Sequence, residues 1–231
     1  MRETRRADVE RIEQRVVDAA LELAREDGWE QVRLSTIADR TGLPLAEIGR
    51  DFRDVDAIAN AWFARARLAM LALTTEELAG QLADARIALA FIAWLDSLAP
   101  HRRVAAEILR HKLYPSHPHH WVPLVFDLSR LVHDLLDAAR IPGRGRLRQA
   151  QEIGLTAITL VTLASWLQDD SPAQEHSKRG LRRRLARAGR IHRAIRPAAD
   201  TGSPTTTEDP AQASEPRKVA LRRWRPGGAP A

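Results

Sequence analysis

The sequence predicts an all-α protein, and three observations support this fold class. Apolar residues recur at helical spacing along most of the first 196 residues. Aromatic residues make up only 5% of the chain, whereas Leu, Ala and Arg are abundant. Residues 34–52, LSTIADRTGLPLAEIGRDF, have the pattern of two short helices joined by a tight turn. With 231 residues and 44% apolar content, the chain can bury one good core or two small ones.

The turn within residues 34–52 is the most specific local signal. Gly42 lacks a Cβ atom and therefore suits the left-handed residue that ends a helix. Pro44 suits the first position of a second helix, where its missing N–H is not needed. Leu45, Ile48 and Phe52 follow at the i, i+3, i+7 spacing of one apolar face. Together these features predict a helix-turn-helix.

Two more helices complete a helix-turn-helix head that we expect over residues 1–65. One is predicted at residues 7–27 and ends at Gly28, beyond which Trp29 should pack into the core. The other is predicted at residues 55–73.

Residues 66–196 are expected to form a larger helical body for ligand binding and dimerisation. Its predicted helices cover residues 76–99, 101–113, 124–139, 149–168 and 178–196. In the first of these, the side chains expected to point inward are Leu78, Leu82, Leu89, Trp94 and Leu98. The fourth is apolar on almost every face and should be the central helix. Residues 114–123, YPSHPHHWVP, indicate a loop, and residues 197–231 a disordered tail.

Several classes of protein are disfavoured by what the sequence lacks. It contains no cysteine, which fits a reducing cytoplasm. The charged first residues have no signal-peptide core, and the uncharged run at residues 153–168 is shorter than the roughly 20 residues of a membrane span. No phosphate loop, nucleophile elbow or acid–base pair of carboxylates is recognisable. We therefore expect a cytoplasmic protein that is not an enzyme, has no catalytic residue and needs no cofactor.

Charge is distributed unevenly along the chain. The first 60 residues carry 10 arginines against 14 acidic residues, whereas residues 178–196 carry one lysine and eight arginines with no acidic residue. Apolar residues in this basic segment are spaced 4, 3, 3 and 4 apart, so one helical face is apolar and the others are cationic. Such a helix can lie on anionic lipid, bind nucleic acid or simply close the body. The candidates for anionic surface contact are Arg183, Arg187 and Arg190.

Two clusters of polar residues, the histidines at 117–120 and the aspartates at 169–170, could have either a structural or a chemical role. His117, His119 and His120 lie among prolines without the i, i+4 spacing of a helical metal site, so we expect no metal site there. A milder functional interpretation is that these histidines line the mouth of a cavity in the body together with Tyr114 and Trp121. Asp169 and Asp170 should end one helix and cap the next.

The head resembles the TetR family of bacterial repressors. The resemblance rests on the Gly-Trp after the first helix, the run at residues 34–52, and RDVDAIANAWF at residues 53–63, and it covers roughly residues 9–65. It implies a homodimer whose heads bind double-stranded operator DNA, while a small ligand in the body changes the separation of the heads. The activity implied is transcription regulation.

On this resemblance, residues 33–53 approach the major groove, and Arg50 is the obvious base or phosphate reader. Glu47 and Asp51 present like charge to the DNA, and phosphate contacts would have to come from arginines nearby. The DNA-binding candidates are Arg33, Ser35, Leu45, Arg50 and Arg53. The hydrophobic ligand is expected among Trp94, Trp121, Leu128, Leu131, Leu160 and Trp166.

A second resemblance covers residues 124–190, most specifically WLQDDSP at residues 166–172 followed by arginines. This half looks like the lipid-binding accessory proteins of ubiquinone biosynthesis, which share the TetR-like architecture. The resemblance implies an isoprenoid or lipid in the cavity, a basic helix at residues 178–196 on the inner face of the membrane, and no DNA binding. Under either interpretation we expect a dimer seam along residues 124–139 and 149–168, with the arginines turned outward.

Overall fold

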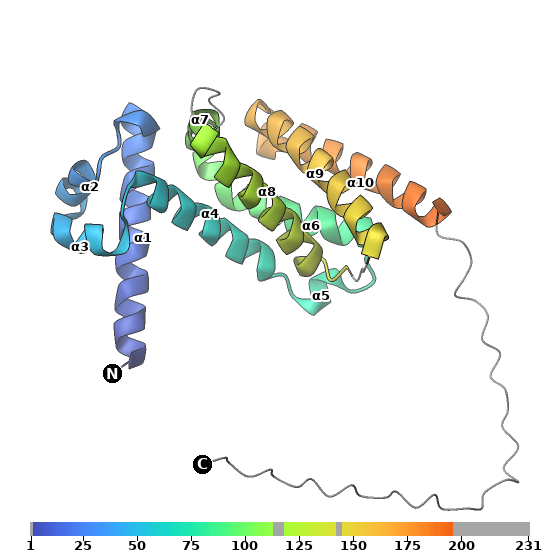
Figure 1. The fold of residues 1–231 in the computed structure, drawn as a ribbon, viewed down its shortest axis with the longest axis horizontal. Coiled ribbons are helices and arrows are strands. Elements are labelled where there is room, and N and C mark those ends of the chain that lie inside the picture. The colour runs from blue at the N-terminus through green and yellow to red at the C-terminus, as the bar shows by residue number, and fades with distance from the viewer. Residues whose placement is uncertain (1, 113–117, 142–144, 196–231) are drawn as a thin grey trace, which may run out of the picture. The chain divides into compact units, whose positions relative to one another are not determined.

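The computed structural model describes residues 2–112, 118–141 and 145–195, and within these ranges every regular element is a helix (Figure 1). The predicted all-α class is confirmed. The predicted tail at residues 197–231 lies outside the described residues.

The N-terminal helices form around the predicted helix-turn-helix. Their bounds are α1 (Arg2–Asp27), η1 (Trp29–Gln31), α2 (Leu34–Thr41), α3 (Leu45–Asp51) and α4 (Val55–Leu71). α1 therefore begins five residues before the predicted helix. Trp29 is buried, as its position after Gly28 predicted. α1 packs on α2 and α4, and α4 continues from this head into the body, where it packs on α6 and α8.

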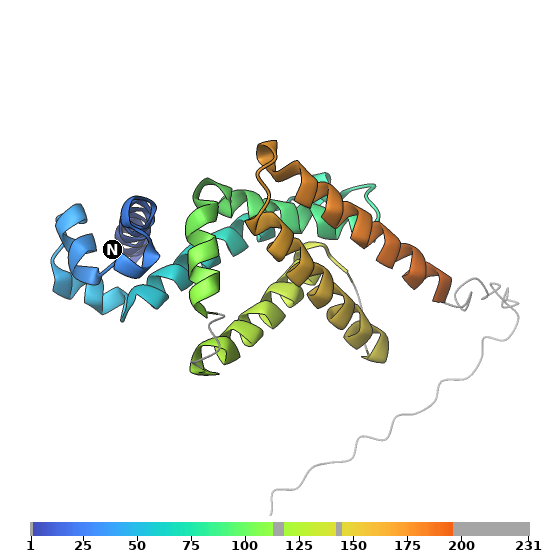
Figure 2. The same cartoon turned by 90° about the horizontal axis from the view of Figure 1, so that it is seen from above.

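The body consists of the remaining helices. Their bounds are α5 (Thr75–Leu78), α6 (Ala83–Leu98), η2 (Ala99–His101), α7 (Arg102–Lys112), α8 (Pro118–Ala138), α9 (Gly145–Leu167), η3 (Pro172–Gln174) and α10 (Glu175–Ile195). α10 packs on both α6 and α9, whereas α8 packs on α4, α6 and α9. Seen from above, α8 and α9 form one side of the body (Figure 2).

Three predictions about the body need correction. The predicted helix at 76–99 is interrupted, because Gly80 adopts a positive φ of 70° between α5 and α6. Leu82 consequently lies outside a helix and is 62% exposed rather than inward. The predicted loop at 114–123 is shorter, because α8 begins at Pro118 and contains His119 and His120; residues 113–117 lie outside the described residues.

The third correction concerns α9, which is not a helix buried on all sides. Leu155 and Trp166 are buried, but Ile153 is 67% and Leu160 52% exposed. The apolar residues of α9 therefore lie on two faces, one packed against the body and one exposed to solvent. This helix, over Arg148–Leu167, is also long and apolar enough to cross a membrane by length and composition, although core helices of other proteins pass the same test. The uncharged run at residues 153–168, which we expected to be too short for a membrane span, therefore overlaps a helix that meets this test of length and composition.

The start of α10 is fixed by Asp169, as the predicted capping role requires. Its carboxylate accepts hydrogen bonds from the Ser171 hydroxyl (2.6 Å), the Ser171 N–H (3.0 Å) and the Ser177 N–H (2.7 Å). Burial alone would raise the pKa of Asp169, but the hydrogen bonds from Ser171 and Ser177 outweigh it and hold that pKa well below its usual range. Asp169 is therefore a charged structural cap.

Candidate nucleic-acid interface and body cavity

The helix-turn-helix is held by a short set of backbone and core contacts. Gly42 adopts the left-handed conformation (φ 69°, ψ 13°), and its N–H donates to the Ala38 carbonyl at 2.8 Å. Ile37 of α2 and Ile48 of α3 are fully buried and fix the two short helices against the core. Pro44 stands immediately before α3 rather than within it. The turn and the two buried isoleucines leave the opposite faces of α2 and α3 to solvent.

All five residues predicted to contact DNA are exposed on this part of the head. Their positions are Arg33 before α2, Ser35 in its first turn, Leu45 and Arg50 in α3, and Arg53 after it. Leu45 is 50% exposed although it is a large apolar side chain. Glu47 is half-buried, so Asp51 is the more exposed of the two acidic residues on α3.

The three arginines differ in how they are held. The Arg33 guanidinium donates to the carbonyls of Glu30 (2.6 Å) and Val32 (2.9 Å). Arg53 forms an ion pair with Asp54 at 2.9 Å. Arg50 forms no hydrogen bond or ion pair with any described residue. Its side chain is therefore the one available to a partner without breaking a contact first.

Asp54 also caps α4, the helix that leads into the body. Its carboxylate accepts the Ala57 N–H at 2.8 Å. Partial burial would raise the pKa of Asp54, but the bonds from Ala57 and Arg53 lower it below its ordinary value. Arg53 is exposed, but it also has a structural role, because it pairs with the residue that caps α4.

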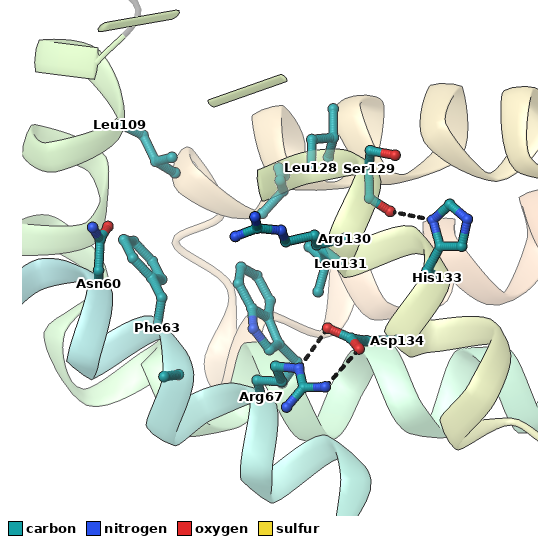
Figure 3. A pocket seen from close by; sticks show the side chains of 13 residues that line it. Asn60, Phe63, Arg67, Leu109, Leu128, Ser129, Arg130, Leu131, His133 and Asp134 are labelled. Atoms are coloured by element: carbon teal, nitrogen blue, oxygen red, sulfur yellow. Dashed lines mark hydrogen bonds and ion pairs between the residues drawn. The ribbon is translucent and has the colours of Figure 1, made fainter. Parts of the chain in front are cut away.

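A cavity of about 780 Å³ opens in the body between α4, α6, α7, α8 and α9 (Figure 3). Three of the predicted ligand residues line it, namely Trp94, Leu128 and Leu131. Trp166 is fully buried elsewhere in the core, and Leu160 lies on the uncovered face of α9. Those two lie on other faces of α9 than the cavity, which Leu163 alone lines among the residues of that helix whose side chains the structure describes. The side chain of Trp121 lies outside the described residues.

The polar residues of the cavity were not predicted. Arg67 of α4 and Asp134 of α8 form a two-pronged ion pair, with Nε to Oδ2 at 2.6 Å and Nη2 to Oδ1 at 2.8 Å. The hydrogen bond that Arg67 donates to the Asp134 carboxylate raises the pKa of Arg67 above its ordinary value. On α4, the cavity is lined by Asn60, Phe63 and Arg67, which follow one another at i, i+3 and i+7. This spacing could have indicated from the sequence that they share one face of the helix.

The body also presents two outward surfaces of different chemistry. On α9, exposed Ile153, Leu160 and Val161 form an apolar face, which we call the α9 apolar face. On α10, the predicted contact residues Arg183, Arg187 and Arg190 are all exposed, whereas Leu181 and Leu185 are buried against the body. Lys178 of the basic segment is buried and pairs with Asp96.

No group of three or more potential metal-ligating side chains occurs in the part of the chain that the structure describes.

Comparisons with known proteins place this architecture in a family. The chain is similar to the crystal structure of a TetR transcriptional regulator from Nitrosomonas europaea, with 35% identity and a TM-score of 0.68 over 77% of this chain and 97% of that one. It shares the fold of a TetR transcriptional regulator from Rhodococcus sp. RHA1, with 16% identity, a TM-score of 0.53 and the same coverage of both chains. No family model matches the chain, and no curated protein does.

The chain therefore belongs to the TetR family of transcriptional regulators. The resemblance to ubiquinone-biosynthesis accessory proteins receives no support from these comparisons.

Proposed function

We propose that this chain is a homodimeric regulator of transcription that binds double-stranded DNA through α2 and α3 and responds to a small hydrophobic ligand in the body cavity. The observation that carries the proposal is the helix-turn-helix with its outer faces open and with Arg50 free of partners among the described residues. The proposal involves no catalytic step.

DNA would meet the start of α2 and the exposed face of α3. Arg50 supplies a charged fork that can bind a guanine edge or a phosphate, and Ser35 supplies a hydroxyl near the N-terminus of α2. Leu45, exposed at the start of α3, suits contact with a thymine methyl group. Arg33 and Arg53 would contact phosphates from the two helix ends.

Dimerisation would place the α9 apolar face against its symmetry mate. α8 and α9 lie on the same side of the body (Figure 2), and Leu160 and Val161 are about half exposed there. A two-fold axis makes the same apolar patch meet itself, which removes it from water. Two heads are thereby held at a fixed separation, as two half-sites on DNA require.

The head and the body would communicate through α4, which is continuous over Val55–Leu71 and packs on helices of both. α4 carries Trp62 into the core, while Phe63 and Arg67 line the cavity. A second link joins the domains, because the Trp29 N–H donates to Glu107 Oε2 of α7 at 2.9 Å. A ligand that shifts α4 relative to α7 would change the position of the head.

The experiment that tests the proposal is fluorescence anisotropy of the protein with its own upstream DNA and with a shuffled duplex of equal composition. We expect tighter binding to the upstream DNA, and at least about a 10-fold loss for Arg50→Glu, because a base or phosphate contact is replaced by repulsion. A matched control is Arg65→Glu, since Arg65 lies on α4 and pairs with Asp18 of α1. Equal binding of both duplexes, or of Arg50→Glu and the parent protein, would refute the proposal.

A further inference from the structure

We propose that the body cavity binds an uncharged, flat aromatic molecule, whose ring stacks on the wall made by Phe63 and Trp94. This inference rests on the proposed ligand response and adds the chemical class of the ligand. Three features of the cavity support it: an ordered aromatic wall, charged groups that already have protein partners, and a row of rings that leads toward the head.

The aromatic wall of the cavity is held in one orientation. Figure 3 shows Phe63 projecting from α4 into the cavity, and its ring lies nearly parallel to that of Trp94, with an interplanar angle of 15° and centroids 6.3 Å apart. Phe63 also contacts Trp62, with 5.3 Å between ring centroids. Trp94 contacts Phe91 at 5.9 Å, and both of these outer rings are buried. Because the wall is already ordered, a flat ring can stack on it without restricting further side chains.

Aliphatic side chains form much of the remaining wall. They come from α7, α8 and α9 and are Leu109, Leu128, Leu131 and Leu163. The volume of about 780 Å³ lies within the range of roughly 300–1,000 Å³ that is usual for small-molecule sites. A ligand in this cavity would therefore gain its affinity mainly by burying apolar surface.

The charged groups of the cavity are already engaged by the protein. Arg67 and Asp134 neutralise one another in their two-pronged ion pair. His133 contacts Glu152, and Arg130 also has an interaction within the protein. A charged ligand would therefore lose water without gaining an unoccupied counter-ion among the described residues that line the cavity. An uncharged ligand has no such cost.

The aromatic wall continues toward the head. Beyond Phe63, Trp62 meets His101 of η2 edge-on, with ring planes at 88° and centroids 6.2 Å apart. Burial lowers the pKa of His101, and charges on α1, those of Arg25 and Asp18 among them, act on it as well. A ligand stacked on Phe63 therefore acts on a contiguous row of packed rings that ends beside a helix of the head.

Isothermal titration calorimetry of the full chain with matched probes tests this inference. Naphthalene-2-methanol and its decahydro derivative share a carbon skeleton and a hydroxymethyl group, but only the first is flat and aromatic. The saturated compound is the more hydrophobic of the two, so a cavity without an aromatic wall would prefer it. We expect naphthalene-2-methanol to bind at least about 3-fold more tightly, because stacking on a ring adds to the burial of its surface.

Two further probes test the preference for an uncharged ligand. Naphthalene-2-carboxylate and 2-naphthylmethylammonium keep the aromatic ring and carry opposite charges. Both should bind at least about 10-fold more weakly than naphthalene-2-methanol, because neither finds an unoccupied counter-ion in the part of the cavity that the structure describes.

The contribution of Phe63 is measured with two variants of that residue. Phe63→Leu removes the ring but keeps an apolar side chain, so the saturated probe should become the tighter ligand, with its own affinity within about 2-fold of that for the parent. Phe63→Tyr keeps a ring and should keep the preference for naphthalene-2-methanol. Phe52→Leu makes the same substitution in the buried core of the head and is the matched control, which should bind both probes like the parent.

Four results would overturn the inference: equal or tighter binding of the saturated probe by the parent, tightest binding of either charged probe, an unchanged preference in Phe63→Leu, or no binding of any probe. The assay contains no DNA, so its result does not depend on whether the head binds DNA. Failure of the ligand class and failure of the proposed DNA binding are therefore distinguishable.

Discussion

The head and the body of this protein differ in what they leave exposed. In the head, α2 and α3 bury Ile37 and Ile48 completely and expose mainly polar and charged side chains. In the body, α9 exposes Ile153 and Leu160, and α10 exposes a row of arginines. Apart from Leu45, α2 and α3 have their large apolar side chains at least partly covered by the chain itself, whereas α9 has an apolar face that a second copy would cover.

The net charges of head and body are the opposite of what their proposed roles would suggest. The first 60 residues have an excess of acidic groups, and the basic residues concentrate on α10 of the body. Shape, not net charge, is therefore what identifies α3 as the proposed DNA reader. A short helix presented by a tight turn can enter a groove, whereas α10 packs along its length on α6 and α9.

The largest expected effect concerns the uncovered side of the body. Ile153→Glu with Leu160→Glu should convert the proposed dimer to a monomer, because four carboxylates would be forced into one apolar seam. We expect the dissociation constant to rise at least about 1,000-fold, measured by sedimentation velocity.

Leu68→Glu is the control, since Leu68 is 62% exposed on α4. Its variant should keep the parent's assembly state. A double variant that sediments like the parent would show that the α9 apolar face is not the seam.

The next effect concerns the covered core of the head. Ile48→Ala should lower the free energy of unfolding by about 3 kcal/mol, because it leaves a cavity where a fully buried side chain packs. Leu45→Ala, three residues earlier on the same helix, should change it by less than about 0.5 kcal/mol. Urea denaturation measures both, and similar losses for the two variants would contradict the proposed facing of α3.

A smaller effect separates two neighbouring aspartates of the body. Asp169→Asn should cost about 2 kcal/mol, since the carboxylate accepts three hydrogen bonds, while the exposed Asp170→Asn should cost far less. Because the pKa of Asp169 is lowered in the folded protein, its stabilisation is present above the unfolded pKa of about 3.9 and is lost as the pH falls.

Thermal unfolding between about pH 7 and pH 2 checks the sign of this effect. The parent should lose stability with acid more steeply than Asp169→Asn. A steeper loss in the variant would show that the carboxylate does not stabilise the fold through its charge.

The smallest effects come from two glycines of the helix-turn-helix. Gly42→Ala should destabilise the head by about 1 kcal/mol, because Gly42 has a φ of 69°, although no atom would clash with the new methyl group. Gly49→Ala, inside α3 with open space around it, should stabilise by about 0.5–1 kcal/mol. Calorimetric melting measures both, and changes of equal sign would contradict the turn geometry.

The sequence predicted the head better than the body for a physical reason. The head is built from local signals, such as Gly42 before Pro44 and the spacing of Leu45, Ile48 and Phe52, which act within a few residues. The faces of α9 depend instead on what packs against it. A pattern apolar on all sides cannot distinguish a core residue such as Trp166 from a surface residue such as Leu160.

The cavity shows the same limit. Trp94, Leu128 and Leu131 could be selected as apolar residues of inward-facing helices. The Arg67–Asp134 ion pair joins residues 67 positions apart, and no local pattern indicates such a pairing. Leu82 was misplaced because the turn at Gly80 separates α5 from α6, and Leu82 lies between the two helices.

The most direct test of the account compares the salt dependence of DNA binding when arginines are neutralised in the head or in the body. Arg50→Gln should reduce the slope of log affinity against log salt by about 2 for a dimer, one phosphate or base contact being lost from each head. Arg183→Gln with Arg187→Gln and Arg190→Gln should leave the slope unchanged, although it removes three times as many charges. An unchanged slope for Arg50→Gln together with a reduced slope for the α10 variant would contradict the account.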